Sequence, residues 1–164
     1  NTTQTSSMGR LFDAVSALIG VRETITYEAQ AAIELEVLAD PHETGYYAWQ
    51  VDENKQINIK AMLENILFDL SKQVGKSIIA ARFHNTIARI TLQIASEIKK
   101  EFGIEQFALS GGVWQNLFLL ERTLVFLRNN GYEPIIHHQL PPNDGCVSFG
   151  QAMIAAYWHI KNKE

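Results

Sequence analysis

Two glycine turns in the last third of the chain carry the residues that could do chemistry. The first, at 110–112 (Ser-Gly-Gly), follows the apolar run at 107–109, and the second lies at 143–145 (Asn-Asp-Gly). Adjacent glycines let a backbone turn sharply and bring main-chain N–H groups close to a ligand. A helix predicted to begin near Val113 would add the partial positive charge of its N-terminus, which favours anions. Two such turns facing one cleft would hold a nucleotide from two sides.

Both turns also have a simpler interpretation, because glycine-containing connections between strands and helices are common in α/β folds. Asp144 has two roles open to it: a ligand for a hard or borderline cation, or a helix N-cap, which needs the same residue type at the same place. Cys146 lies at a helix start that would stabilise a thiolate. No general base is indicated beside it, so we expect a structural role for this cysteine.

Composition limits the class of protein. The chain has 164 residues, of which 46% are hydrophobic and 20% charged, as expected for one globular domain or part of a larger one. A net charge of −4 argues against non-specific binding to nucleic acid or to a membrane surface. One cysteine excludes an internal disulfide and favours the cytoplasm. No apolar run or signal pattern indicates a membrane span or export, and a start without Met suggests an excised piece.

Helical spacing of apolar residues dominates the first part of the chain. It predicts helices at 8–19, 27–38, 59–74 and 78–102. Their predicted N-caps are Ser6 or Ser7, Thr26, Asn58 and Ser77. The segment 46–51 could form a strand.

After Gly103 the pattern changes to alternating strands and helices, which predicts a mainly helical subdomain at 1–102 and a βαβα half at 103–164. The predicted elements there are strands at 106–109 and 133–137 and helices at 113–129 and 148–160. A right-handed βαβ crossover makes the two strands parallel. Two strands do not form a stable sheet, so either the segment 46–51 or chain outside this sequence must complete it. Trp114, Phe149 and Trp158 are expected in the core.

The sequences of these turns resemble those of a known family. SGGVWQN at 110–116 and PPNDGCVSFG at 141–150 closely resemble the C-terminal end of the HypF carbamoyltransferases, which mature NiFe hydrogenases. The segments 8–19 and 27–36 look like the middle section of the same module, whereas 41–76 matches loosely. The more distant resemblance is to tRNA threonylcarbamoyl-transfer proteins and the actin/hexokinase-like ATPases.

The resemblance implies a fold and a site. The fold is a helix-rich α/β structure, the second lobe of an actin/hexokinase-like (ribonuclease H-like) ATPase fold with a helical subdomain. Ser110, Gly111 and Gly112 would lie against the nucleotide phosphates, and Asn116 would bind the nucleoside end. Gly9 and Asp13 share one helix face, where Asp13 would accept hydrogen bonds from the ribose hydroxyls. Asp144 would be a metal ligand.

The resemblance also implies a function. The whole protein would be an ATP- and carbamoyl-phosphate-dependent carbamoyltransferase that binds ATP or carbamoyl-adenylate and a divalent metal ion. It would pass the carbamoyl group to the C-terminal cysteine of a HypE-type partner during cyanide ligand synthesis, in the cytoplasm. The isolated piece would be inactive, since the family's metal-binding histidine pair and adenylate-forming domain are not found in these residues. A non-catalytic nucleotide-binding or assembly module and a tRNA threonylcarbamoyl-transfer relative stay open as alternatives.

Overall fold

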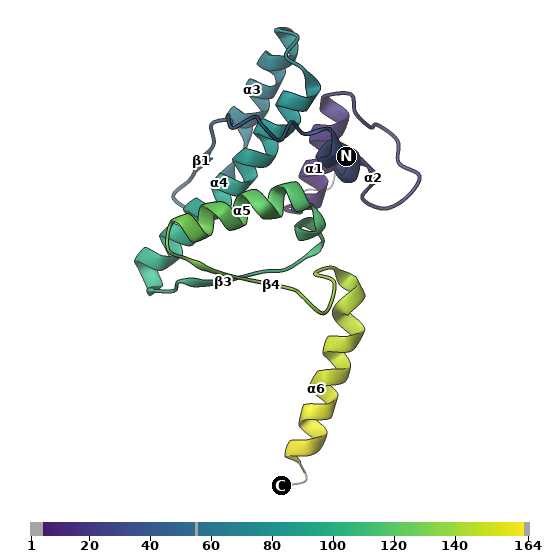
Figure 1. The fold of residues 1–164 in the computed structure, drawn as a ribbon, viewed down its shortest axis with the longest axis vertical. Coiled ribbons are helices and arrows are strands. Elements are labelled where there is room, and N and C mark those ends of the chain that lie inside the picture. The colour runs from purple at the N-terminus through teal and green to yellow at the C-terminus, as the bar shows by residue number, and fades with distance from the viewer. Residues whose placement is uncertain (1–4, 55, 163–164) are drawn as a thin grey trace.

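The chain folds into a helix-rich α/β structure, described here by a computed structural model for residues 5–54 and 56–162 (Figure 1). The first part contains α1 (Met8–Leu18), α2 (Gln30–Leu38), β1 (Gln50–Val51), β2 (Ile57–Asn58), α3 (Lys60–Ser71) and α4 (Lys76–Phe102). The second part contains β3 (Gln106–Leu109), the 3-10 helix η1 (Gly112–Gln115), α5 (Leu117–Asn129), β4 (Glu133–Ile136), the 3-10 helix η2 (Asp144–Cys146) and α6 (Val147–Lys161).

The N-terminal helices form where the apolar spacing predicts them, but their starts depend on capping. Ser7 caps α1 as predicted, because its hydroxyl accepts the backbone N–H of Arg10. The predicted Thr26 cap is wrong. The N-cap of α2 is Ala29, in the left-handed conformation with φ 61°, and the Gln30 side chain accepts the Thr26 N–H at 2.8 Å instead.

The helix predicted at 59–74 is shorter in the structure, and the helix predicted at 78–102 is longer. After α3 ends at Ser71, Gln73 takes a left-handed φ of 58°, which stops the helix before Val74. Gly75 then becomes the N-cap of α4, so the predicted Ser77 cap is wrong. Asn58 does accept the N–H of Lys60 at 2.9 Å, one residue before the N-cap position of α3.

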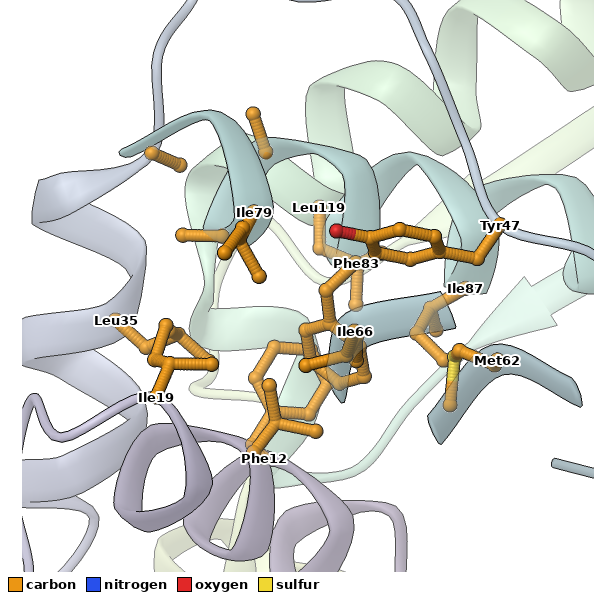
Figure 2. Packing of buried hydrophobic residues seen from close by; sticks show 14 of the residues in the cluster. Phe12, Ile19, Leu35, Tyr47, Met62, Ile66, Ile79, Phe83, Ile87 and Leu119 are labelled. Atoms are coloured by element: carbon orange, nitrogen blue, oxygen red, sulfur yellow. The ribbon is translucent and has the colours of Figure 1, made fainter. Parts of the chain in front are cut away.

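The core is built around the middle of α4. Consecutive residues of this helix are buried, which requires neighbours on all sides of it. Figure 2 shows Phe12 of α1, Leu35 of α2, Met62 of α3 and Leu119 of α5 in one cluster with Phe83 of α4. The α5 helix packs along α4, so residues on either side of Gly103 share one core. The division of the chain at Gly103 stays a prediction.

A partly buried polar cluster holds the loop before β1 against this core. The Tyr47 hydroxyl donates to the Asp69 carboxylate at 2.9 Å, and Arg82 pairs with both Asp69 and Glu43. Burial and the neighbouring Asp69 raise the pKa of Tyr47, so the phenol stays a donor. The loop is therefore fixed on α3 and α4, although its sequence is the least regular of the chain.

Two separate two-stranded sheets are present in the described residues. β3 and β4 pair in parallel, from Gln106 opposite Glu133 to Leu109 opposite Ile136, as the βαβ order predicts. β1 pairs antiparallel with β2, so one of the two alternatives, that the segment 46–51 completes the β3–β4 sheet, is wrong. α5 lies along one face of the β3–β4 pair (Figure 1), and Ile135 of β4 is 53% exposed.

The last helix stands apart from this body. Figure 1 shows α6 extending away from the remaining elements, and each residue from 147 to 162 is exposed. Phe149 and Trp158, expected in the core, are therefore exposed, whereas Trp114 packs between the two core clusters as predicted. No helix in the described ranges combines the length and apolar character needed to cross a membrane.

Removing α6 is expected to leave the body intact. A chain ending at Cys146 should have an unfolding temperature within about 2 °C of that of the longer chain, because α6 contributes no buried side chain. Thermal unfolding followed by circular dichroism measures this, and the same spectra should be dominated by helix. A fall of more than about 5 °C would show that α6 packs on the body in solution.

Candidate functional site

One large cavity opens between the N-terminal helices and the two glycine turns. It has a volume of about 970 Å³ and is lined by the start of α1, by α2, by η1 and the start of α5, and by 143–145. These segments come from both ends of the chain. The cavity is therefore a product of the tertiary fold and not of one local motif.

The two glycine turns meet at the wall of this cavity, as the sequence predicts. The Gly111 N–H donates to the Pro142 carbonyl oxygen at 2.7 Å, and the Asn143 side-chain amide donates to Gln115 at 3.2 Å. Gly111 has φ 107° and ψ 158°, a conformation that only glycine adopts readily. The hydrogen bond from the first turn to Pro142 thus depends on this one glycine.

The predicted site residues divide into two groups. Gly9, Gly112, Asn116 and Asp144 line the cavity. The others lie outside the lining: the Asp13 carboxylate pairs with Arg10 at 3.0 Å. Ser110 places its hydroxyl 3.0 Å from Nε2 of His137, and Gly111 holds the turn behind Gly112. The roles of all seven in ligand binding stay predictions.

The helix after the first turn begins later than predicted. η1 covers Gly112–Gln115, and α5 starts at Leu117 with Asn116 as its N-cap. The Asn116 side-chain oxygen accepts the Leu119 N–H at 2.8 Å, which ends the tighter turn and begins the α-helix. Asn116 therefore lies at the N-cap of α5 rather than one turn inside a helix.

The expected anion site at this helix start is already filled by a side chain. Oε1 of Glu36 on α2 accepts the N–H of Leu117 at 2.6 Å and that of Phe118 at 3.2 Å. The carboxylate also complements the positive end of α5. The N–H groups of Gly112 and Val113, the first two of η1, have no partner within that helix. They remain as backbone donors on this side of the cavity.

Asn116 is held from behind by a buried histidine. His84 has no exposed surface, its Nδ1 lies 2.7 Å from the Ala80 carbonyl oxygen, and its Nε2 lies 2.9 Å from Nδ2 of Asn116. Burial lowers the pKa of His84 to about 4, so the ring is neutral at physiological pH. His84 is therefore a core residue.

The described residues do not supply a complete set of ligands for a metal ion. Asp144 is exposed at the cavity edge, and Asn143 occupies the N-cap of η2, where its side chain accepts the Gly145 N–H at 3.1 Å. The alternative of Asp144 as that N-cap is therefore wrong. Residues 5–54 and 56–162 contain no group of three or more His, Cys, Asp or Glu residues that could hold a cation. Asp144 could supply one ligand and no more.

Reasoning from the sequence missed both supporting residues, Glu36 and His84. For His84 a signal exists: three consecutive polar residues, 84–86, lie between apolar residues in the middle of a long helix, and in the structure all three are buried. A buried polar residue needs a partner, and for His84 the partner is Asn116. Glu36 gives no such signal, because it is separated from Leu117 by 81 residues.

The buried His84 is expected to make stability depend on pH. The unfolded state binds a proton near the ordinary histidine pKa of 6.5, whereas the folded state resists it down to about 4. Stability is then complete above pH 6.5 and is lost as the pH falls toward 4, by about 2 kcal/mol between pH 7.5 and pH 5. Urea unfolding of the wild type and His84→Gln at both pH values measures this. The wild type should show the steeper pH dependence, and a His159→Gln control on exposed α6 should match the wild type.

The fold and cavity place the chain in a defined class. Residues 1–151 match the family described as carbamoyltransferase, Kae1-like domain, second subdomain. The carbamoyltransferase HypF of Synechocystis sp. is 38% identical over 154 residues, which cover 91% of this chain and 19% of the relative. The probable carbamoyltransferase HypF of Methanocaldococcus jannaschii is 32% identical, with 91% and 20% covered.

Solved structures agree with the sequence relatives. A full-length HypF, crystallised in a phosphate- and nucleotide-bound form, matches with a TM-score of 0.86 and 45% identity over 92% of this chain and 20% of its own. HypF of T. kodakarensis matches with a TM-score of 0.80 and 27% identity over 98% and 21%. The chain belongs to the HypF carbamoyltransferase family, as the second subdomain of the Kae1-like domain. It spans about a fifth of the length of these relatives.

Proposed function

We propose that this chain is the nucleotide-holding lobe of a carbamoyltransferase. The whole enzyme passes a carbamoyl group from carbamoyl-adenylate to the C-terminal cysteine of a HypE-type partner during NiFe hydrogenase maturation in the cytoplasm. The observation that carries the proposal is a cavity that collects Gly9, Gly112, Asn116 and Asp144 from segments far apart in the chain. The matching HypF structure adds support, since that protein was crystallised in a phosphate- and nucleotide-bound form.

Each part of the adenylate has a place in the cavity. The phosphate lies against the N–H groups of Gly112 and Val113, because Glu36 occupies those of α5. The nucleoside lies against Asn116. The ribose lies near Gly9 and Asp13, whose half-exposed ion pair with Arg10 is weak enough to be exchanged.

The transfer is an acyl transfer. The thiolate of the partner cysteine attacks the carbamoyl carbon, a C–S bond forms, the C–O bond to the phosphate breaks, and AMP leaves. The thiol has first lost its proton to solvent. Backbone N–H groups of the first glycine turn stabilise the charge that develops on the departing phosphate. ATP and carbamoyl phosphate are the sources of the adenylate, and Asp144 would supply one oxygen ligand to a divalent cation completed by residues outside the described part.

Replacing Gly111 with alanine tests the nucleotide site. The change forces a Cβ into a conformation with φ 107° and should shift the turn that presents the Gly112 N–H. We expect the dissociation constant for ATP, measured by calorimetry on the whole natural protein that carries this chain, to rise at least about tenfold. Gly131→Ala is the control: it strains a glycine with φ 76° after α5, away from the cavity, and should leave ATP binding unchanged. A wild type that does not bind ATP would overturn the proposed function.

A further inference from the structure

His84 lies directly behind the cavity wall, and among residues 5–54 and 56–162 its one polar side-chain partner is Asn116. Its ring is enclosed edge-to-face by Phe12, Phe83 and Phe118, with centroid distances of 5.2, 5.8 and 5.2 Å. The ring reaches out of this apolar enclosure at Nε2, which lies 2.9 Å from Nδ2 of Asn116. A neutral imidazole donates from one nitrogen and accepts at the other. Here a backbone carbonyl group decides which nitrogen of His84 donates and which accepts.

The Ala80 carbonyl sets the tautomer of the ring. A carbonyl oxygen can only accept, so the 2.7 Å contact places the His84 proton on Nδ1. Nε2 is then a bare acceptor, and the atom of Asn116 that faces it must be a donor. The orientation of the Asn116 amide is thereby determined: the NH₂ group points to His84 and the oxygen points to the Leu119 N–H.

This orientation leaves Asn116 with defined capacity toward the cavity. One of its two amide hydrogens is used by His84, and one of the two lone pairs of its oxygen is used by Leu119. One donor and one acceptor remain on a side chain that lines the cavity. A flipped amide would put its NH₂ group against the Leu119 N–H, and the cap of α5 would be lost. It would also exchange the positions of the donor and the acceptor that face the cavity.

We propose that His84 is a positioning residue for nucleotide binding, which fixes the amide of Asn116 so that one donor and one acceptor face the nucleoside. This inference rests on the proposed function, because it assumes a nucleoside in this cavity. His84 itself touches no ligand and acts through Asn116. Its role is more than packing, since a ring that only filled space would not need an acceptor at Nε2.

A matched pair of substitutions separates positioning from packing. Glutamine can place an acceptor oxygen near the position of Nε2, whereas leucine has a similar size and none. For a position enclosed by three phenylalanine rings, packing alone favours leucine. Positioning favours glutamine, so the two explanations predict opposite orders.

The experiment measures ATP affinity by calorimetry in the whole natural protein that carries this chain. We expect His84→Gln to bind ATP within about threefold of the wild type and His84→Leu at least about tenfold more weakly. His84→Met, also without an acceptor oxygen at Nε2, replaces the leucine variant if that fails to fold. The control is His159→Leu on exposed α6, which should bind as the wild type does.

A double-mutant cycle tests whether His84 acts through Asn116. Asn116→Ser keeps an N-cap residue for α5 but is too short to reach His84. In this background, His84→Leu should weaken ATP binding no further, whereas two independent residues would show additive losses. Equal affinities of the glutamine and leucine variants, or additivity in the cycle, would overturn the inference while leaving the proposed function standing. A wild type without ATP binding would overturn both.

Discussion

Replacing Phe83 with alanine is expected to lower the free energy of unfolding of this chain by about 3–5 kcal/mol. Phe83 lies at the centre of the core with no exposed surface, and its ring meets that of Phe12 edge-to-face at 4.8 Å. Alanine would lose the buried ring and leave a cavity between α1, α4 and α5, because close-packed neighbours relax only in part. Urea unfolding at neutral pH measures the loss.

Phe102→Ala is the matched control, because this phenylalanine ends the same helix and is 64% exposed. It should change the free energy of unfolding by less than about 0.5 kcal/mol. A similar loss in both variants would contradict the placement of the core around the middle of α4.

Asp144→Asn is expected to lower metal content and carbamoyl transfer at least about tenfold in the whole natural protein while leaving its folding unchanged. Asparagine keeps the shape of the side chain but loses its negative charge and one coordinating oxygen. Folding should survive, because Asn143 already caps η2 and Asp144 is exposed. Metal analysis, transfer to the partner thiol and thermal unfolding are the three measurements.

The control for lost charge is Asp52→Asn, since Asp52 lies in the turn between β1 and β2, where its carboxylate accepts the N–H groups of Asn54 and Gln56. It removes the same charge far from the cavity and should alter neither metal content nor transfer. Unchanged metal and transfer in Asp144→Asn would remove Asp144 from the metal site.

Helix positions were predictable because their signals are local. The apolar spacing of α1 and the Ser7 cap lie within one short stretch, and both agree with the structure. The helix starts were less predictable where a side chain of the helix itself bonded to the residue expected to cap it. Gln30 accepts the Thr26 N–H and thereby delays α2, although Thr26 is a good cap by residue type.

The meeting of the two glycine turns was also predictable, since each turn follows a strand and the strands are parallel neighbours. Parallel strands bring the segments after their carboxyl ends to one edge of the sheet. The pairing of Leu109 with Ile136 places 110–112 beside the loop that reaches 143–145. The hydrogen bond from Gly111 to Pro142 is the result.

The sequence by itself determined the family, the helices, the parallel strand pair and the two turns that face one cavity. Only the tertiary structure decided which polar groups that cavity leaves free. Glu36 covers the start of α5 across 81 residues, and His84 orients Asn116 across 32. It also decided that Phe149 and Trp158 stay exposed, because the described elements bury no side chain of α6. Residue type and spacing encode local turns and faces, whereas the partner of a side chain depends on contacts between segments that no local pattern records.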